Sequence, residues 1–197
     1  MNHLAHLLLA GDAPEAKVGQ VLADFVTAGE IAKFAPGIQS GIRAHQRIDS
    51  FADGHPVFAR ARRRLHPPYR RFGGVLLDIY FDHFLARSWE RHGDGGSLIG
   101  FAERAYRVLH EYRNLPSARF RVVVAAMRHD NWLVGYTSLA GVDRALCGLS
   151  KRFPRANPLA SGGAVLRDQY AALAGDFEEF FPPLAEYART IVRAEGD

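Results

Sequence analysis

The chain has 197 residues, of which 48% are hydrophobic, and its formal net charge is +4. This length is enough for one well-buried core, and no shift in composition marks a boundary, so we expect a single compact domain over residues 1–197. The single cysteine, Cys147, excludes an intrachain disulfide framework. No apolar run approaches the roughly 20 residues of a membrane-spanning helix, and the start of the chain lacks the basic segment of a signal peptide. We therefore expect a cytoplasmic protein without a membrane partner.

Arginine supplies almost all of the positive charge, since Lys17, Lys33 and Lys151 are the only lysines. Arginine pairs bidentately with phosphates and carboxylates. The composition therefore favours an anionic substrate or an acidic protein partner, and solvated surface charge is the competing interpretation.

The first residues have helical spacing. Leu4, Leu7 and Leu8 mark the apolar side of this helix, and His3 and His6 lie on a neighbouring side. Either histidine is a candidate to face inward.

A second helix is expected to begin at Pro14 and to run through Phe25. It places Asp24 at the margin of its apolar stripe. Aspartates at such margins are usually solvated, so Asp24 by itself is a weak functional candidate.

A third helix follows Pro36 and shows an inward-facing seam at alternating spacings of four and three, made of Ile38, Ile42, His45, Asp49 and Ala52. His45 and Asp49 thus occupy positions where apolar residues are expected. They are candidates for a buried site, although a satisfied pair across one helical turn explains them as well. Arg47 points to another side, where it either reaches a phosphate at the rim of a site or faces water.

The densest positive patch follows in the next helix and the turn after it, and consists of Arg60, Arg62, Arg63, Arg64, Arg70 and Arg71. Tyr69 and Phe72 are the only stacking aromatics among these residues. An acidic protein surface is therefore a better partner than single-stranded nucleic acid, and a solvated face is the alternative.

The stretch 75–85 holds eight large apolar residues around Asp78, Asp82 and His83. A helix that is apolar nearly all round is a buried helix, and a buried carboxylate costs several kcal/mol unless it is paired, protonated or bound to a metal. Asp78 and Asp82 lie one turn apart on one face, which is a workable metal half-site. Buried hydrogen bonds and ion pairs to arginines are the competing explanation. We expect this helix to continue to about His92.

Further helices are expected over 98–112, 118–136 and 138–149, a loop or lid over 153–163, and a terminal helix from Tyr170 to Arg193 that breaks at Pro182-Pro183. No strand alternation or glycine-rich phosphate loop is present, so an all-α fold is predicted. The dipeptide His129-Asp130 is flanked by polar residues and is therefore expected on a helix surface rather than in a metal site.

The inward or marginal ionisable groups form the candidate metal-binding set: His6, Asp24, His45, Asp49, Asp78, Asp82 and His83. Imidazole and carboxylate without thiolate suit manganese, iron, zinc or magnesium, and an oxygen-rich set favours manganese or magnesium. The chemistry indicated is hydrolysis, because a metal activates water and offsets phosphoryl charge. Within this set we assign catalytic roles to Asp24, His45 and Asp78, with Arg47 stabilising the phosphoryl group.

Four motifs carry a family resemblance: MNHLAHL at 1–7, LADF at 22–25, HQRID at 45–49 and DHFLAR at 82–87. Together, and in this order over essentially the whole chain, they resemble the acyl carrier protein phosphodiesterases, or holo-acyl-carrier-protein hydrolases, which are divergent relatives of the HD-domain phosphohydrolases. The adjacent pair in this chain is Asp82-His83, in the reverse order to an HD pair.

The resemblance implies a single HD-like helical domain and a divalent metal, manganese most of all, with magnesium or iron as alternatives. It also implies hydrolysis of the phosphodiester that joins 4'-phosphopantetheine to the serine of holo-acyl carrier protein, an acidic partner used in fatty acid biosynthesis. The products are the apo-carrier and free 4'-phosphopantetheine. An HD-type nucleotide phosphohydrolase and a non-catalytic helical binding protein are the alternatives.

Overall fold

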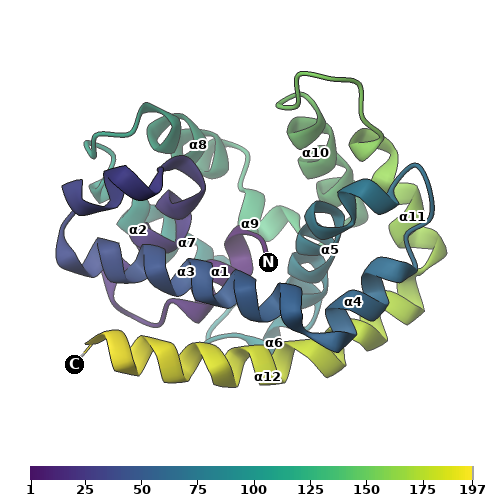
Figure 1. The fold of residues 1–197 in the computed structure, drawn as a ribbon, viewed down its shortest axis with the longest axis horizontal. Coiled ribbons are helices and arrows are strands. Elements are labelled where there is room, and N and C mark those ends of the chain that lie inside the picture. Colours follow the sequence, from purple (N-terminus) through teal and green to yellow (C-terminus); the bar gives the residue numbers. More distant parts are fainter. Residues whose placement is uncertain (197) are drawn as a thin grey trace.

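The computed structural model describes the backbone of residues 1–196 and the side chains of residues 1–192, and this part of the chain contains helices and no strand (Figure 1). The prediction of one all-helical domain is therefore confirmed. The α-helices are α1 (His3–Leu9), α2 (Pro14–Leu22), α3 (Pro36–Gly54), α4 (Pro56–Arg63), α5 (Gly73–Arg87), α6 (Trp89–His92), α7 (Leu98–Glu111), α8 (Ala118–His129), α9 (Trp132–Gly135), α10 (Leu139–Ser150), α11 (Gly162–Asp168) and α12 (Tyr170–Gly196). Short 3₁₀ turns are η1 (Ala23–Phe25), η2 (Ala28–Lys33), η3 (Arg70–Phe72) and η4 (Leu159–Ser161).

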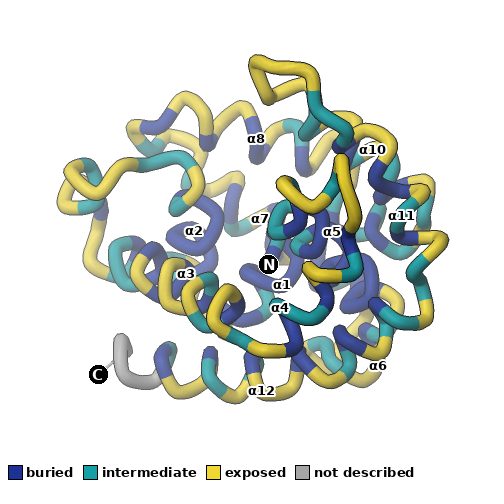
Figure 2. Tube along the Cα trace, turned by 45° about the vertical axis from the view of Figure 1, so that its right-hand side comes forward, coloured by how far each residue is buried: buried dark blue, intermediate teal, exposed yellow. Residues whose placement is uncertain are grey.

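Helix α5 lies at the centre, as its apolar sequence predicts. It packs against α1, α4, α10 and α12, and its side chains from Leu76 to Ala86 are buried with the exception of Asp78. Figure 2 shows the buried parts of α1, α2 and α5 around the start of the chain. The polar groups of α5 are therefore held in the core, where each one needs a partner.

The close contact between α2 and α3 depends on two glycines. A Cβ on Gly41 would lie 2.5 Å from the carbonyl oxygen of Ala16, and a Cβ on Gly19 would overlap the carbonyl oxygen of Ile38. Only glycine permits this approach of two backbones. As a result, Gln20 of α2 lies directly against His45 of α3.

The predicted helix over 118–136 is interrupted, which corrects that expectation. Asn131 has a φ of 46°, a left-handed conformation that asparagine adopts more easily than most residues. The chain therefore ends α8 at His129 and starts the short helix α9 at Trp132. This turn brings Trp132 and Tyr136 to the wall of a cavity of about 770 Å³.

The predicted break at Pro182-Pro183 is wrong, because both prolines lie inside the continuous helix α12, which runs beneath α3 and α4 (Figure 1). The prolines are exposed, whereas the apolar residues on either side of them are buried, namely Phe177, Phe180, Phe181, Leu184, Ala188 and Ile191. Burial of one face before and after the prolines holds both parts in line and outweighs the local cost of proline in a helix.

Two other boundaries differ slightly from the predictions. Helix α2 ends at Leu22, so Asp24 lies in the 3₁₀ turn η1, and α5 ends at Arg87 before the separate turn α6. The predicted loop over 153–163 is irregular up to Pro158 and then enters η4 and α11. Among the described residues, no helix is both long and apolar enough to span a membrane.

Candidate metal centre

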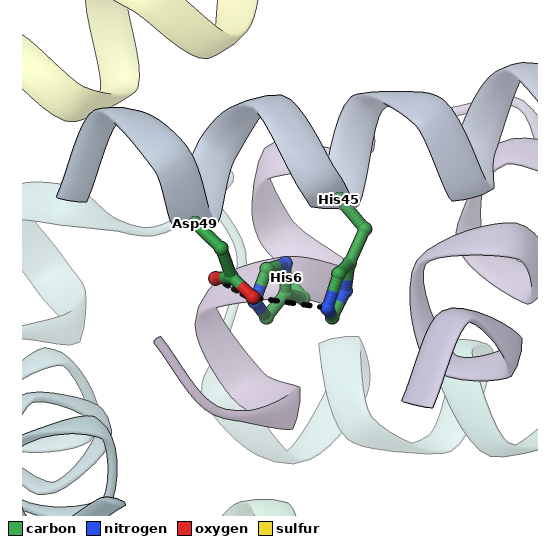
Figure 3. Close-up of side chains that lie close together, drawn as sticks. All are labelled: His6, His45 and Asp49. Carbon is green, nitrogen blue, oxygen red and sulfur yellow. Dashed lines mark hydrogen bonds and ion pairs between the residues drawn. The ribbon is translucent and has the colours of Figure 1, made fainter. Parts of the chain in front are cut away.

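Three of the candidate side chains meet between α1 and α3: His6, His45 and Asp49 (Figure 3). The Nε2 atoms of both histidines lie 3.1 Å from the Asp49 carboxylate, His6 from Oδ1 and His45 from Oδ2. One ligand atom from each residue lies within 4.8 Å of the others. The two rings are stacked, with centroids 4.0 Å apart. Two imidazole nitrogens and a carboxylate oxygen thus surround one small volume, a donor set that suits a divalent metal.

Both histidines are oriented by Gln20, which is 1% exposed. Its side-chain oxygen Oε1 lies 2.8 Å from Nδ1 of His6, and its main-chain oxygen lies 2.8 Å from Nδ1 of His45. Because a main-chain oxygen only accepts hydrogen bonds, Nδ1 of His45 must donate its proton to it, and Nδ1 of His6 faces Oε1 of Gln20 in the same way. Nε2 of each ring faces Asp49, and loss of the proton that it donates to this carboxylate frees the Nε2 lone pair for a metal. Such a partner behind a histidine is typical of metal ligands.

The charges within the cluster are strongly coupled. Burial and the neighbouring His45 lower the pKa of His6. Burial also acts to lower the pKa of His45, but the hydrogen bond to Asp49 and the nearby Asp24 outweigh it and raise that pKa. Burial acts to raise the pKa of Asp49, yet hydrogen bonds from His45 and His6 hold it well below its usual range. Asp49 is therefore an ionised carboxylate at neutral pH, as a metal ligand must be.

Asp24 and Asp78 lie beside this cluster. The Asp24 carboxylate is 3.5 Å from Nε2 of His45 and 46% exposed. Asp78 is 32% exposed and accepts a 2.9 Å hydrogen bond from the ammonium group of Met1, which also lies 3.5 Å from Asp49. Burial raises the pKa of Asp78, whereas the ammonium group acts to lower it.

Asp24, Asp49 and Asp78 all line a cavity of about 770 Å³. His6 and His45 are buried beneath it. The rest of the lining combines apolar and aromatic side chains with two arginines, including His3, Phe25, Val75, Ile79, Trp132, Tyr136, Arg144, Leu149 and Arg152. The Arg152 guanidinium lies 5.4 Å from the Trp132 ring. The cavity thus offers carboxylates and cations beside an apolar wall, which suits an organic phosphate ester.

Asp82 and His83 do not join the cluster, although the sequence placed them in the candidate set. Asp82 is fully buried, and its two oxygens accept the backbone N–H groups of Leu4 and Ala5 at 2.7 and 3.2 Å. It therefore holds the N-terminal turn of α1, where a carboxylate is favoured. His83 lies between the carbonyl oxygen of Tyr136 at 2.6 Å and the hydroxyl of Tyr170 at 3.0 Å. Both of its ring nitrogens are occupied.

Two further candidates lie outside the cavity or at its edge. Arg47 is exposed on α3 and is not among the residues that line the cavity. His129 is exposed, as expected, and contacts Asp130 at 2.7 Å. Asp130 itself is exposed but also lies at the cavity wall, which its sequence context did not indicate.

The predicted arginine patch is divided by ion pairs. Arg60 and Arg64 both contact the buried carboxylate of Asp176 on α12, at 2.8 and 2.7 Å, and Arg60 also pairs with Glu179. These two arginines attach α4 to α12. The remaining members are exposed, namely Arg62, Arg63, Arg70 and Arg71.

Several residues of the site had no signal in the sequence. In the sequence Gln20 looks like any other polar helix residue, and its contacts with the histidines depend on the packing of α2 against α3. Trp132, Arg144 and Arg152 reach the cavity only because the chain turns at Asn131, far along the sequence from the first helices.

Comparison with known proteins gives a consistent result. The family model described as acyl carrier protein phosphodiesterase matches residues 1–184. A protein of that name from Photorhabdus laumondii is 32% identical over 188 residues, which cover 95% of this chain and 95% of the relative. Those from Serratia proteamaculans and Yersinia enterocolitica are 32% and 33% identical over 189 residues, covering 96% of this chain and 98% of each relative. No solved structure gives a significant match, so the HD-like label stays a prediction.

Proposed function

Because the chain belongs to the acyl carrier protein phosphodiesterase family, we propose that it hydrolyses the phosphodiester between 4'-phosphopantetheine and the serine of holo-acyl carrier protein. The products are the apo-carrier and free 4'-phosphopantetheine. Because the substrate is an acyl carrier protein, we also propose that the protein is cytoplasmic. The observation that carries the proposal is the convergence of His6, His45 and Asp49 directly beneath a cavity large enough for an organic phosphate ester.

The proposed metal ligands are His6, His45 and Asp49, with manganese preferred and magnesium or iron as alternatives. The donor set fits such an ion, since the Nε2 atoms of both histidines face the ionised carboxylate of Asp49. When bound, a divalent metal lowers the pKa of water and offsets the charge of the phosphoryl group. Asp82 and His83 are left out of this set, because their own hydrogen bonds occupy them.

The other polar residues of the cavity have separate roles. Asp24 and Asp78 line the cavity, and their proposed role is to accept a proton from the attacking water. The water oxygen forms the new bond to phosphorus, the bond from phosphorus to the serine oxygen breaks, and the serine oxygen takes up a proton. Arg144 and Arg152 line the cavity and stabilise the phosphoryl charge, the role that the sequence assigned to Arg47.

The test is a mass measurement on holo-acyl carrier protein incubated with the protein and manganese. Loss of the phosphopantetheine group is expected, and chelation of the metal or the substitution Asp49→Ala should prevent it. A carrier that keeps its full mass while the protein is folded and loaded with metal would overturn the proposal. Turnover of a nucleotide in a parallel reaction would instead favour the HD-type nucleotide phosphohydrolase.

A further inference from the structure

A second cavity of about 660 Å³ lies next to the site, between the end of α4, the start of α5 and the segment 151–158 that follows α10. Three arginines line it: Arg62 of α4, Arg71 of the turn η3 and Arg155 of the segment 151–158. We call it the arginine groove. Its lining also contains Phe72 and the exposed Phe153, whose rings pack edge to face with centroids 5.8 Å apart.

The arginines of the groove differ in their pairing from six other arginines of this protein. Arg60, Arg64, Arg91, Arg104, Arg167 and Arg189 each pair with an acidic side chain of the same chain. In the part of the chain that the structure describes, the side chains of Arg62, Arg71 and Arg155 make no ion pair. The lining also includes Asp53 and Asp78, but neither carboxylate forms an ion pair with these three arginines, so their guanidinium groups are available to an anionic partner.

The groove borders the larger cavity at the candidate metal centre. Val75 and Asp78 line both the groove and the larger cavity, so the two spaces meet at α5 beside the cluster. A phosphodiester between a protein and a small organic group has two substituents of different chemistry, the protein on one side of the phosphate and the small group on the other. The larger cavity, with its apolar wall and Trp132, suits the small organic group. The arginine groove, with exposed aromatic and cationic side chains, has the composition of a protein-binding surface.

We propose that the arginine groove is the docking site for the acidic protein that carries the phosphodiester, so that the phosphate passes Asp78 into the cavity. This inference rests on the proposed function. The arginine groove replaces the docking surface of six arginines that the sequence predicted, because Arg60 and Arg64 already form ion pairs with Asp176 and Glu179.

The chain offers a closely matched control. Arg63, Arg70 and Lys151 are exposed and lie within a few residues of Arg62, Arg71 and Arg155, but they line neither cavity. The groove variant carries Arg62→Glu, Arg71→Glu and Arg155→Glu, and the control variant carries Arg63→Glu, Arg70→Glu and Lys151→Glu. Both change the net charge equally on the same segments, so they differ only in whether the charge lies in the groove.

Binding of holo-acyl carrier protein to the metal-free protein is measured by titration calorimetry at low and at physiological salt, together with KM and kcat in the presence of manganese. The groove variant should bind at least about tenfold more weakly and show a raised KM with nearly unchanged kcat, and the control should stay within about threefold. Melting curves verify that both variants are folded.

Equal affinity of the groove and control variants would overturn the inference, even if the wild-type protein releases phosphopantetheine. Groove-dependent binding without release would support the docking site while contradicting the proposed function. The binding and the hydrolysis measurements thus separate the two ideas.

Discussion

Two groups of polar side chains on inward-facing helix positions look alike in sequence and differ in structure. His6, His45 and Asp49 meet between α1 and α3, and each histidine uses Nδ1 for a fixed hydrogen bond while Nε2 faces a shared volume. Asp82 and His83 lie in α5, where every side-chain ligand atom already has a protein partner.

The difference shows that burial alone does not identify a metal ligand. What matters is whether hydrogen bonds consume the ligand atoms or orient them toward one point. Asp82 supports the site in a different manner, because it anchors the N-terminal turn of α1, the helix that carries His6. One group is thus proposed to bind the metal and the other to hold the helix in place.

The largest effect is expected from Asp49→Ala. Loss of the carboxylate between the two histidines should reduce metal affinity by more than about a hundredfold, because even partners behind the ligands contribute 10–100-fold. Metal content and phosphopantetheine release should fall together. Gln46→Ala, at an exposed position of α3 that lines neither cavity, is the control and should keep both. Full metal content in folded Asp49→Ala would remove this residue from the site.

Asp82→Ala is expected to lower the stability of the fold without lowering metal affinity. Two buried backbone N–H groups would lose their acceptor, which should lower the free energy of unfolding by about 2–4 kcal/mol. Denaturation by urea in the presence of a chelator measures this. The folded fraction should still bind manganese, whereas a stable Asp82→Ala variant that fails to bind the metal would make Asp82 a ligand after all.

A smaller effect on the metal is expected from Gln20→Leu, which removes the acceptor behind His6. Metal affinity should fall by about 10–100-fold. Gln20→Glu keeps an oxygen acceptor at that place and should retain binding. The ¹⁵N shifts of the His6 ring in the metal-free protein report the same change, because they distinguish a proton on Nδ1 from one on Nε2. An unchanged His6 tautomer in Gln20→Leu would show that Gln20 does not orient the ring.

The pH dependence of stability should also separate the two groups. Burial raises the pKa of Asp82 to about 7, although the amide hydrogen bonds act to lower it. Since the unfolded carboxyl has a pKa of 3.8, the unfolded state loses this proton first. The contribution of Asp82 to stability should therefore decrease as the pH rises from about 4 to about 7, by at most about 1.4 kcal/mol per pH unit. The metal-free protein should lose stability relative to Asp82→Asn over that range, and a constant difference would contradict the raised pKa.

Much of the fold was accessible from the sequence, because the burial of α5 and the inward seam of α3 follow from local spacing of apolar residues. Helical spacing also predicted that His45 and Asp49 face inward, and it made His6 a candidate. Other features depend on tertiary contacts that leave no local pattern. The role of Gln20 requires the glycine-mediated approach of α2 and α3, and that of Asp82 requires the docking of α1 on α5. The straight course of α12 through two prolines likewise reflects burial on both sides of them.

The central claim is that His6, His45 and Asp49 hold a divalent metal. Pulsed electron paramagnetic resonance of the manganese-loaded protein, labelled with ¹⁵N-histidine, tests it most directly, because the spectrum counts the histidine nitrogens bound to the ion. We expect two bound nitrogens in the wild-type protein, one in His45→Ala, and two in His83→Ala. A manganese signal without histidine nitrogens, or one that changes in His83→Ala but not in His45→Ala, would contradict the account.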